Sequence, residues 1–129
     1  MIVDASALLA ILFEEPEEDR FLELIQEDKS PAISPVNLVE AGIKADDPRH
    51  PAKGRALDAL ISAMNIEVAA ITAEQARIAR EAYQRYGKGR HPARLNLGDC
   101  FAYALATVRE EPLLFKGNDF TQTDVEAAI

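Results

Sequence analysis

Cysteine and histidine are scarce in this 129-residue sequence, which contains one cysteine and two histidines. With Cys100 alone, the chain can form neither an internal disulfide nor a zinc site built from several cysteines. We expect Cys100 to be a small core residue, because the carboxylate of Asp99 beside it disfavours the reactive thiolate. His50 and His91 both lie in RHPA segments that are typical of loops, which argues against a catalytic pair of histidines.

Long apolar runs are also missing from the sequence. No stretch approaches eighteen consecutive apolar residues, and the amino terminus lacks the basic segment of a secretion signal. We therefore expect a cytoplasmic protein. The length and the 48% content of hydrophobic residues suit one ordinary globular domain over residues 1–129.

Positive charge is scarce overall but concentrated in one segment. The formal net charge of −8 argues against a protein that simply coats nucleic acid. Between residues 77 and 94, however, one acidic residue accompanies six basic ones, which are Arg77, Arg80, Arg85, Lys88, Arg90 and Arg94. This segment is a candidate surface for a phosphate backbone. Tyr83 and Tyr86 lie within it and either stack on unpaired bases or pack in the ordinary way against a helix.

Short apolar segments alternate with helical patterns along the chain. Strands are expected at residues 1–3, 31–34, 66–71 and 112–115, and helices at 5–15, 17–28, 35–45, 55–64, 74–86 and within 95–108. A last short helix is expected over 121–129, because Thr121 and Asp124 have the spacing of a capping box. Strands separated by helices imply parallel crossovers, so we predict an α/β layer fold.

Four carboxylates occur at strand ends or beside apolar helix faces. They are Asp4 and Asp119, which follow the first and last strands, Asp99 in the first turn of an apolar helix, and Glu40 beside an apolar helix stripe. Buried carboxylates are costly unless they are paired, hydrogen-bonded or bound to a metal. A hard cation such as Mg²⁺ or Mn²⁺ would offset their repulsion if they converge. Helix capping is the alternative explanation for Asp99, and for either Asp4 or Ser6.

The chain resembles the PIN-domain nucleases, and most closely the VapC-type toxins of bacterial toxin–antitoxin pairs. The resemblance lies in four acidic motifs that occur in the family's order, MIVDASALLAIL, SPVNLVEAGI, LNLGDCFAYALA and LLFKGNDFTQTDV. It covers nearly the whole chain and implies a three-layer fold in which helices flank a short parallel sheet. It also implies cleavage of RNA that depends on Mg²⁺ or Mn²⁺, neutralisation by a small VapB-like antitoxin, and a homodimer.

The resemblance also assigns residues to the site. The catalytic and metal-binding carboxylates that it implies are Asp4, Glu40, Asp99 and Asp119. Ser6 is expected to support Asp4, and Asn118 is expected as a second supporting residue. Many members carry an acidic residue one or two places earlier in the last motif, where this chain has Gly117 and Asn118. Asp119 is the expected fourth group, because a carboxylate is a stronger ligand for a hard cation than the amide of Asn118.

Two other classes of protein remain open. A Mg²⁺-dependent phosphoryl-transfer or receiver-like domain also carries aspartates at strand ends, but this chain lacks an adjacent acidic pair after its first strand, and Glu40 within a helix suits that class poorly. The second class is a PIN-like fold kept only as a binding module, which the altered last motif allows. For a nuclease, the sequence favours water activated by a metal ion, since it offers no convincing cysteine or histidine nucleophile.

Overall fold

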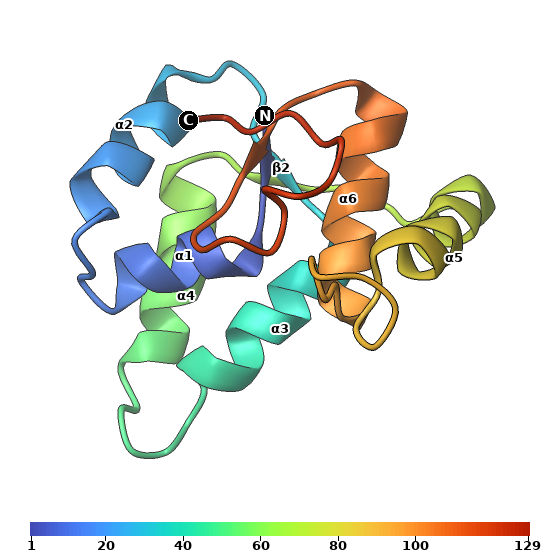
Figure 1. Ribbon diagram of the computed structural model, residues 1–129. Helices are drawn as coiled ribbons and strands as arrows, with labels where there is room; N and C mark the ends of the chain where they lie inside the picture. Colours follow the sequence, from blue (N-terminus) through green and yellow to red (C-terminus); the bar gives the residue numbers. More distant parts are fainter.

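A four-stranded parallel sheet forms the centre of the protein, seen here in a computed structural model that describes residues 1–129 (Figure 1). The strands are β1 (Ile2–Val3), β2 (Ala32–Ile33), β3 (Glu67–Val68) and β4 (Leu113–Leu114), in the order β3-β2-β1-β4. In the register, Ile2 faces Ala32 on one side and Leu113 on the other. Each strand has only two residues, so the helices supply most of the apolar surface of the core.

Six helices cover the two faces of this sheet. They are α1 (Ala5–Leu12), α2 (Glu18–Glu27), α3 (Pro35–Ala45), α4 (Lys53–Ala63), α5 (Ala73–Tyr86) and α6 (Leu97–Arg109). None of them has both the length and the apolar character needed to span a bilayer. The alternation of strands and helices confirms the predicted α/β layer fold.

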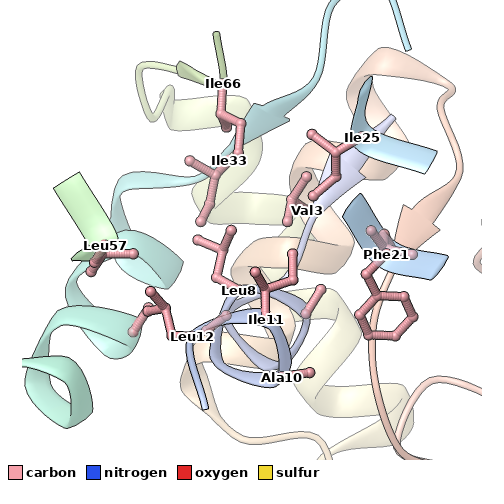
Figure 2. Close-up of a cluster of buried hydrophobic side chains, with 14 of the residues drawn as sticks. Val3, Leu8, Ala10, Ile11, Leu12, Phe21, Ile25, Ile33, Leu57 and Ile66 are labelled. Atoms are coloured by element: carbon pink, nitrogen blue, oxygen red, sulfur yellow. The ribbon is translucent and has the colours of Figure 1, made fainter. Parts of the chain in front are cut away.

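Two apolar clusters lie on opposite faces of the sheet, because neighbouring residues of a strand point to opposite sides. Val3, Ile33 and Leu114 belong to the cluster that is covered by α1, α2 and α4. Figure 2 shows two members of this cluster, Leu8 of α1 near its middle and Phe21 of α2 at its side. The other residue of each of these strands belongs to the cluster with α5 and α6. The arrangement is a three-layer fold with the sheet in the middle.

Helices α1 and α3 begin directly after strands, which places their first turns at the carboxyl edge of the sheet. Asp4 follows β1 and caps α1, and Ser34 follows β2 and caps α3. Each side chain accepts a backbone N–H that the helix itself leaves unpaired. The predicted cap of α5 is confirmed as well, since Thr72 accepts the backbone N–H of Gln75 at 3.1 Å.

The prediction of a carboxyl-terminal helix is wrong. Residues 121–129 form turns followed by an extended segment in which Ala127 pairs in parallel with Leu113 of β4. The backbone N–H of Leu113 donates to Glu126 at 2.8 Å, and that of Ala128 donates back to Leu113 at 2.9 Å. Pairing satisfies backbone groups at the edge of β4, whereas a nine-residue helix has little stability of its own.

The residues that suggested this helix have other partners. The hydroxyl of Thr121 donates to the backbone carbonyl of Asn118 at 2.7 Å and closes a turn. Asp124 accepts a hydrogen bond of 2.5 Å from the hydroxyl of Tyr103 on α6. The spacing of a capping box is therefore present, but Thr121 closes a local turn and Asp124 makes a tertiary contact instead.

Most elements differ by one residue at one or both ends from those predicted, and three differ by more. The first helix ends at Leu12 rather than at residue 15, α4 begins at Lys53 rather than at residue 55, and the third strand is restricted to Glu67–Val68. Glu14 has a φ of 54°, a left-handed conformation that cannot continue an α-helix. The apolar pattern overestimated the length of the first helix, because the pattern of apolar residues does not indicate where the backbone changes to a left-handed conformation.

Candidate active site

An acidic pocket opens at the carboxyl edge of the sheet, between the first turns of α1 and α6, the helix α3 and the loop after β4. Its volume is about 310 Å³. All four carboxylates singled out in the sequence line it, namely Asp4, Glu40, Asp99 and Asp119. Ser6, Lys44, Asn96 and Lys116 also contribute to the wall. The fold thus brings together side chains from distant parts of the chain.

Asp4 is buried and uses one of its oxygens for local structure. Its Oδ2 accepts the backbone N–H of Ser6 at 3.1 Å and the Ser6 hydroxyl at 2.6 Å. The same hydroxyl accepts the backbone N–H of Lys116 at 2.9 Å. Asp4 is therefore the cap of α1, and Ser6 joins Asp4 to the loop after β4. The other oxygen, Oδ1, has only a 3.5 Å contact with the Asn37 amide.

Asp99 takes part in a complete capping box at the start of α6. Its Oδ2 accepts the backbone N–H of Asn96 at 3.0 Å, and Oδ1 of Asn96 accepts the backbone N–H of Asp99 at 2.9 Å. The capping alternative is therefore correct for one oxygen of Asp99. It leaves Oδ1 without a hydrogen bond inside the protein, on a side chain that lines the acidic pocket.

Asn37 is a residue of this site that sequence reasoning missed. It lies on α3, one turn before Glu40, and its amide group donates to Oε1 of Glu40 at 3.3 Å and to the backbone carbonyl of Gly98 at 2.9 Å. A Cβ atom on Gly98 would lie 2.2 Å from Oε2 of Glu40, so a side chain at residue 98 would force that carboxylate to move. The signal available in the sequence was a lone amide in an apolar helix, three residues before an acidic one.

Asp4, Glu40 and Asp99 share an environment that opposes their ionisation. Burial raises the pKa of Asp99 to about 7, and the charges of the neighbouring carboxylates add to this rise against the lowering effect of its backbone hydrogen bond. Burial is also the main cause that raises the pKa of Asp4 and of Glu40. A group shifted in this way is stabilised either by a proton or by a positive charge close to it.

The donor atoms of the pocket suit a hard, hydrated cation. They are carboxylate oxygens without histidine or cysteine, the chemistry that Mg²⁺ and Mn²⁺ prefer. No three of the carboxyl groups come close enough together to hold one ion by themselves. Mg²⁺ keeps several of its waters and is usually bound through one or two carboxylates, so this spacing fits it. Asp4 and Asp99, each with one oxygen left over from capping, are the direct candidates.

The loop after β4 directs Asp119 and Asn118 to different places. Asp119 is exposed and lines the acidic pocket. Asn118 lines a separate pocket, together with Phe21 and Ile129. The structure therefore brings the expected fourth carboxylate to the site and leaves the amide outside it.

The six basic residues between 77 and 94 are all exposed, but they lie outside the acidic pocket. Lys88, Arg90 and Arg94 line an open depression of about 510 Å³ on the loop that joins α5 to α6. Arg77 forms an ion pair with Glu81 at 3.0 Å. The loop ends at Asn96, which caps α6 and lines the acidic pocket, so the basic loop is joined to the pocket along the chain.

The two tyrosines of this segment differ. Tyr86 is only 8% exposed and packs against Tyr103, with their ring centroids 5.9 Å apart, so stacking on a base is wrong for Tyr86 and ordinary packing is correct. Tyr83 is 40% exposed, and the guanidinium of Arg90 lies 5.6 Å from its ring centroid. Tyr83 alone keeps a face available to a ligand.

Cys100 and the two histidines pack against or hydrogen-bond with other residues of the fold and lie outside the acidic pocket. Cys100 is buried in the α5–α6 cluster, and burial raises the pKa of its thiol to about 11, which confirms the expected core residue. His50 packs edge-on against the ring of Phe13, and Nδ1 of His91 accepts the backbone N–H of Ala93 at 3.0 Å. Neither histidine lines the acidic pocket.

Comparison with known proteins identifies the family. The model of the PIN domain family matches residues 1–126. The chain belongs to the PIN domain family. Ribonuclease VapC28 of Mycobacterium tuberculosis is 45% identical to it over 130 residues, covering 100% of this chain and 98% of the relative. Ribonuclease VapC of Mycolicibacterium smegmatis is 44% identical over 127 residues, covering 98% of each chain.

Solved structures share the fold of this PIN domain. VapC20 of Mycobacterium tuberculosis, described as a sarcin–ricin loop cleaving toxin, has a TM-score of 0.77 and 16% identity, covering 96% of this chain and 95% of the other. VapBC2 from Rickettsia felis, bound to a DNA fragment of its promoter, has a TM-score of 0.76 and 14% identity, covering 98% and 94%. Membership of the PIN family removes the receiver-like alternative.

The raised pKa of Asp99 predicts how stability depends on pH in metal-free buffer. In the folded state the Asp99 carboxyl keeps its proton up to about pH 7, whereas in the unfolded chain it has the ordinary pKa of 3.8. The contribution of Asp99 to folding stability that is present below pH 4 is therefore lost as the pH rises to 7. Asp99→Asn removes this loss. At pH 8 we expect its thermal midpoint to exceed that of the wild type by about 3–5 °C, equivalent to about 1 kcal/mol in a domain of this size.

Differential scanning calorimetry at pH 4 and pH 8 measures this difference, which should vanish at pH 4. Asp58→Asn is the matched control, because Asp58 is exposed on α4 and lies outside the pocket. An equal difference between Asp99→Asn and the wild type at both pH values would show that Asp99 is not under electrostatic strain.

Proposed function

We propose that this PIN-domain protein is a ribonuclease toxin that cleaves RNA phosphodiester bonds with water, with Mg²⁺ or Mn²⁺ as cofactor. The observation that carries the proposal is the acidic pocket, in which carboxylates from four separate segments converge. Relatives that align over the whole chain at 44–45% identity are named ribonucleases, which supports the same activity. Cytoplasmic RNA is the substrate class that we assign.

The residues of the pocket divide the chemical work. Asp4 and Asp99 would hold the cation with the oxygens that capping leaves free, and Glu40 and Asp119 would act through its bound waters. When bound, Mg²⁺ or Mn²⁺ lowers the pKa of water and stabilises the charge that develops on the phosphate. Ser6 fixes the orientation of Asp4 through its 2.6 Å hydrogen bond.

The basic loop next to the pocket would bind the RNA on either side of the cleaved bond. Lys88, Arg90 and Arg94 hold phosphates in the open depression, and Arg77, Arg80 and Arg85 extend this positive surface along α5. Exposed phosphate contacts of this kind supply affinity but little sequence preference. Tyr83 offers a ring on which one unpaired base stacks.

Two protein partners belong to the proposal. A small VapB-like antitoxin would insert an arginine or lysine into the acidic pocket, where its charge-assisted hydrogen bonds would take the place of the cation. One structural neighbour is a toxin–antitoxin complex from Klebsiella pneumoniae, with a TM-score of 0.71 and 20% identity, covering 95% of this chain and 92% of the other. A second copy of the chain would cover the apolar side chains of Val39, Ile43 and Leu97, which are 62%, 72% and 71% exposed on α3 and α6, the helices that carry Glu40 and Asp99.

The central test is cleavage of RNA by the purified protein in Mn²⁺. We expect the wild type to cleave and Asp99→Asn to lose about 100-fold or more in rate, because replacing a metal ligand costs at least as much as replacing a group that supports one. Asp58→Asn should retain the wild-type rate. Cleavage by Asp99→Asn at the wild-type rate would show that the site is misassigned, and a wild type that leaves RNA intact would favour a binding module.

The identity of the fourth acidic group needs a separate comparison. Asp119→Asn should slow cleavage about 10-fold or more and raise the Mn²⁺ concentration needed for half-maximal rate, since it removes a charged donor from the pocket. Asn118→Ala should cost less, because Asn118 lies in another pocket. Initial rates over a Mn²⁺ titration measure both. Greater damage from Asn118→Ala would assign the amide, and not Asp119, to the site.

The antitoxin can be tested by growth of a bacterial host. Induced expression of the wild type should arrest growth, whereas expression of Asp99→Asn should not, because only the wild type cleaves RNA. Coexpression of the small reading frame adjacent to its gene should restore growth. Continued arrest with every adjacent small reading frame would contradict neutralisation by a neighbouring antitoxin.

A further inference from the structure

Asn37 contacts Asp4, Glu40 and Gly98, which belong to three elements around the acidic pocket. Its own side chain lies behind these residues and does not line the pocket. We propose that Asn37 is a positioning residue: its amide holds the carboxylates of Glu40 and Asp4 at a fixed separation and fastens α3 to α6 at Gly98. The inference rests on the proposed metal-dependent function, because the separation of these carboxylates matters only if they act together on one cation.

The contacts of Asn37 fix the orientation of its amide. The amide nitrogen lies 2.9 Å from the carbonyl oxygen of Gly98, 3.3 Å from Oε1 of Glu40 and 3.5 Å from Oδ1 of Asp4. All three neighbours are acceptors, so the NH₂ group and not the carbonyl must face them. One N–H serves Gly98, which leaves the other to be shared by the two carboxylates.

Gly98 forms the other side of this arrangement. A Cβ atom there would lie 2.2 Å from Oε2 and 2.6 Å from Cδ of Glu40, so the carboxylate rests against the backbone of α6. Glu40 is therefore held between the amide of Asn37 and the first turn of α6. That turn also carries Asp99, so the same contact sets how α3 and α6 present their carboxylates to the pocket.

Packing alone does not account for an asparagine at this position. Asn37 is 0% exposed, and its Oδ1 is buried without a hydrogen-bond partner, which destabilises the fold. An apolar side chain of similar size would avoid that cost. What an apolar side chain cannot supply is a donor between two like charges, and a shared donor reduces their repulsion while keeping both oxygens near one point.

The test replaces Asn37 by leucine, which has a similar size and no donor. Calorimetric titration with Mn²⁺ in the absence of RNA and initial rates of RNA cleavage are measured on the full chain. We expect Asn37→Leu to weaken Mn²⁺ binding or lower kcat about 10-fold or more, with KM for RNA within about twofold, as for groups that support metal ligands. Gln26→Leu is the matched control, because Gln26 is an exposed amide on α2 outside the pocket.

A purely structural role predicts a different result. Asn37→Leu would then change only the thermal midpoint, with Mn²⁺ affinity and kcat per folded molecule unchanged, and this outcome would overturn the proposal. If Asn37→Leu does not fold, Gly98→Ala displaces Glu40 from the opposite side and should produce the same loss; unchanged Mn²⁺ affinity and kcat there would overturn it too. A wild type that binds Mn²⁺ but leaves RNA intact would refute only the ribonuclease proposal, since the Mn²⁺ titration still tests Asn37.

Discussion

Repulsion between carboxylates at the carboxyl edge of a parallel sheet is the constraint on which this structure depends. The sheet topology brings the ends of β1 and β4 together, and α3 and α6 add their own acidic residues. Burial makes the charges of Asp4, Glu40 and Asp99 more costly, as the pKa of about 7 for Asp99 shows. A fold that tolerates this arrangement must hold its buried and half-buried carboxylates by fixed hydrogen bonds, as it does for Asp4, Glu40 and Asp99.

The fold meets this requirement by giving site residues two tasks. Asp4 caps α1 and Asp99 completes the capping box of α6, and each commits only one oxygen to the helix. Helix N-termini attract negative charge, so the helix dipoles offset part of the electrostatic cost. The directions of the free oxygens are then set by backbone geometry rather than by flexible side chains. Such preorganisation is what a metal site or a catalytic site requires.

The sequence predicts those features that depend on local patterns. Asp4 was identified because it directly follows an apolar strand, Asp119 because it lies in the loop just beyond the last strand, and Asp99 because it begins an apolar helix. Asn37 was not identified, since its role depends on Gly98, which is 61 residues away in the sequence. The final helix was predicted wrongly because the pairing of Ala127 with Leu113 outweighed the local capping pattern. Tertiary pairing cannot be read from spacing alone.

The pairing of the carboxyl-terminal segment has a consequence for the loop that carries Asp119. The backbone of Leu113 bonds to Glu126 and to Ala128, so the chain between β4 and these residues begins and ends at the same point of the sheet. Closure of this kind removes conformational freedom from everything between the joined ends. The last residues of the chain therefore restrain the loop between β4 and residue 126. The position of Asp119 in that loop depends on a segment that does not line the pocket.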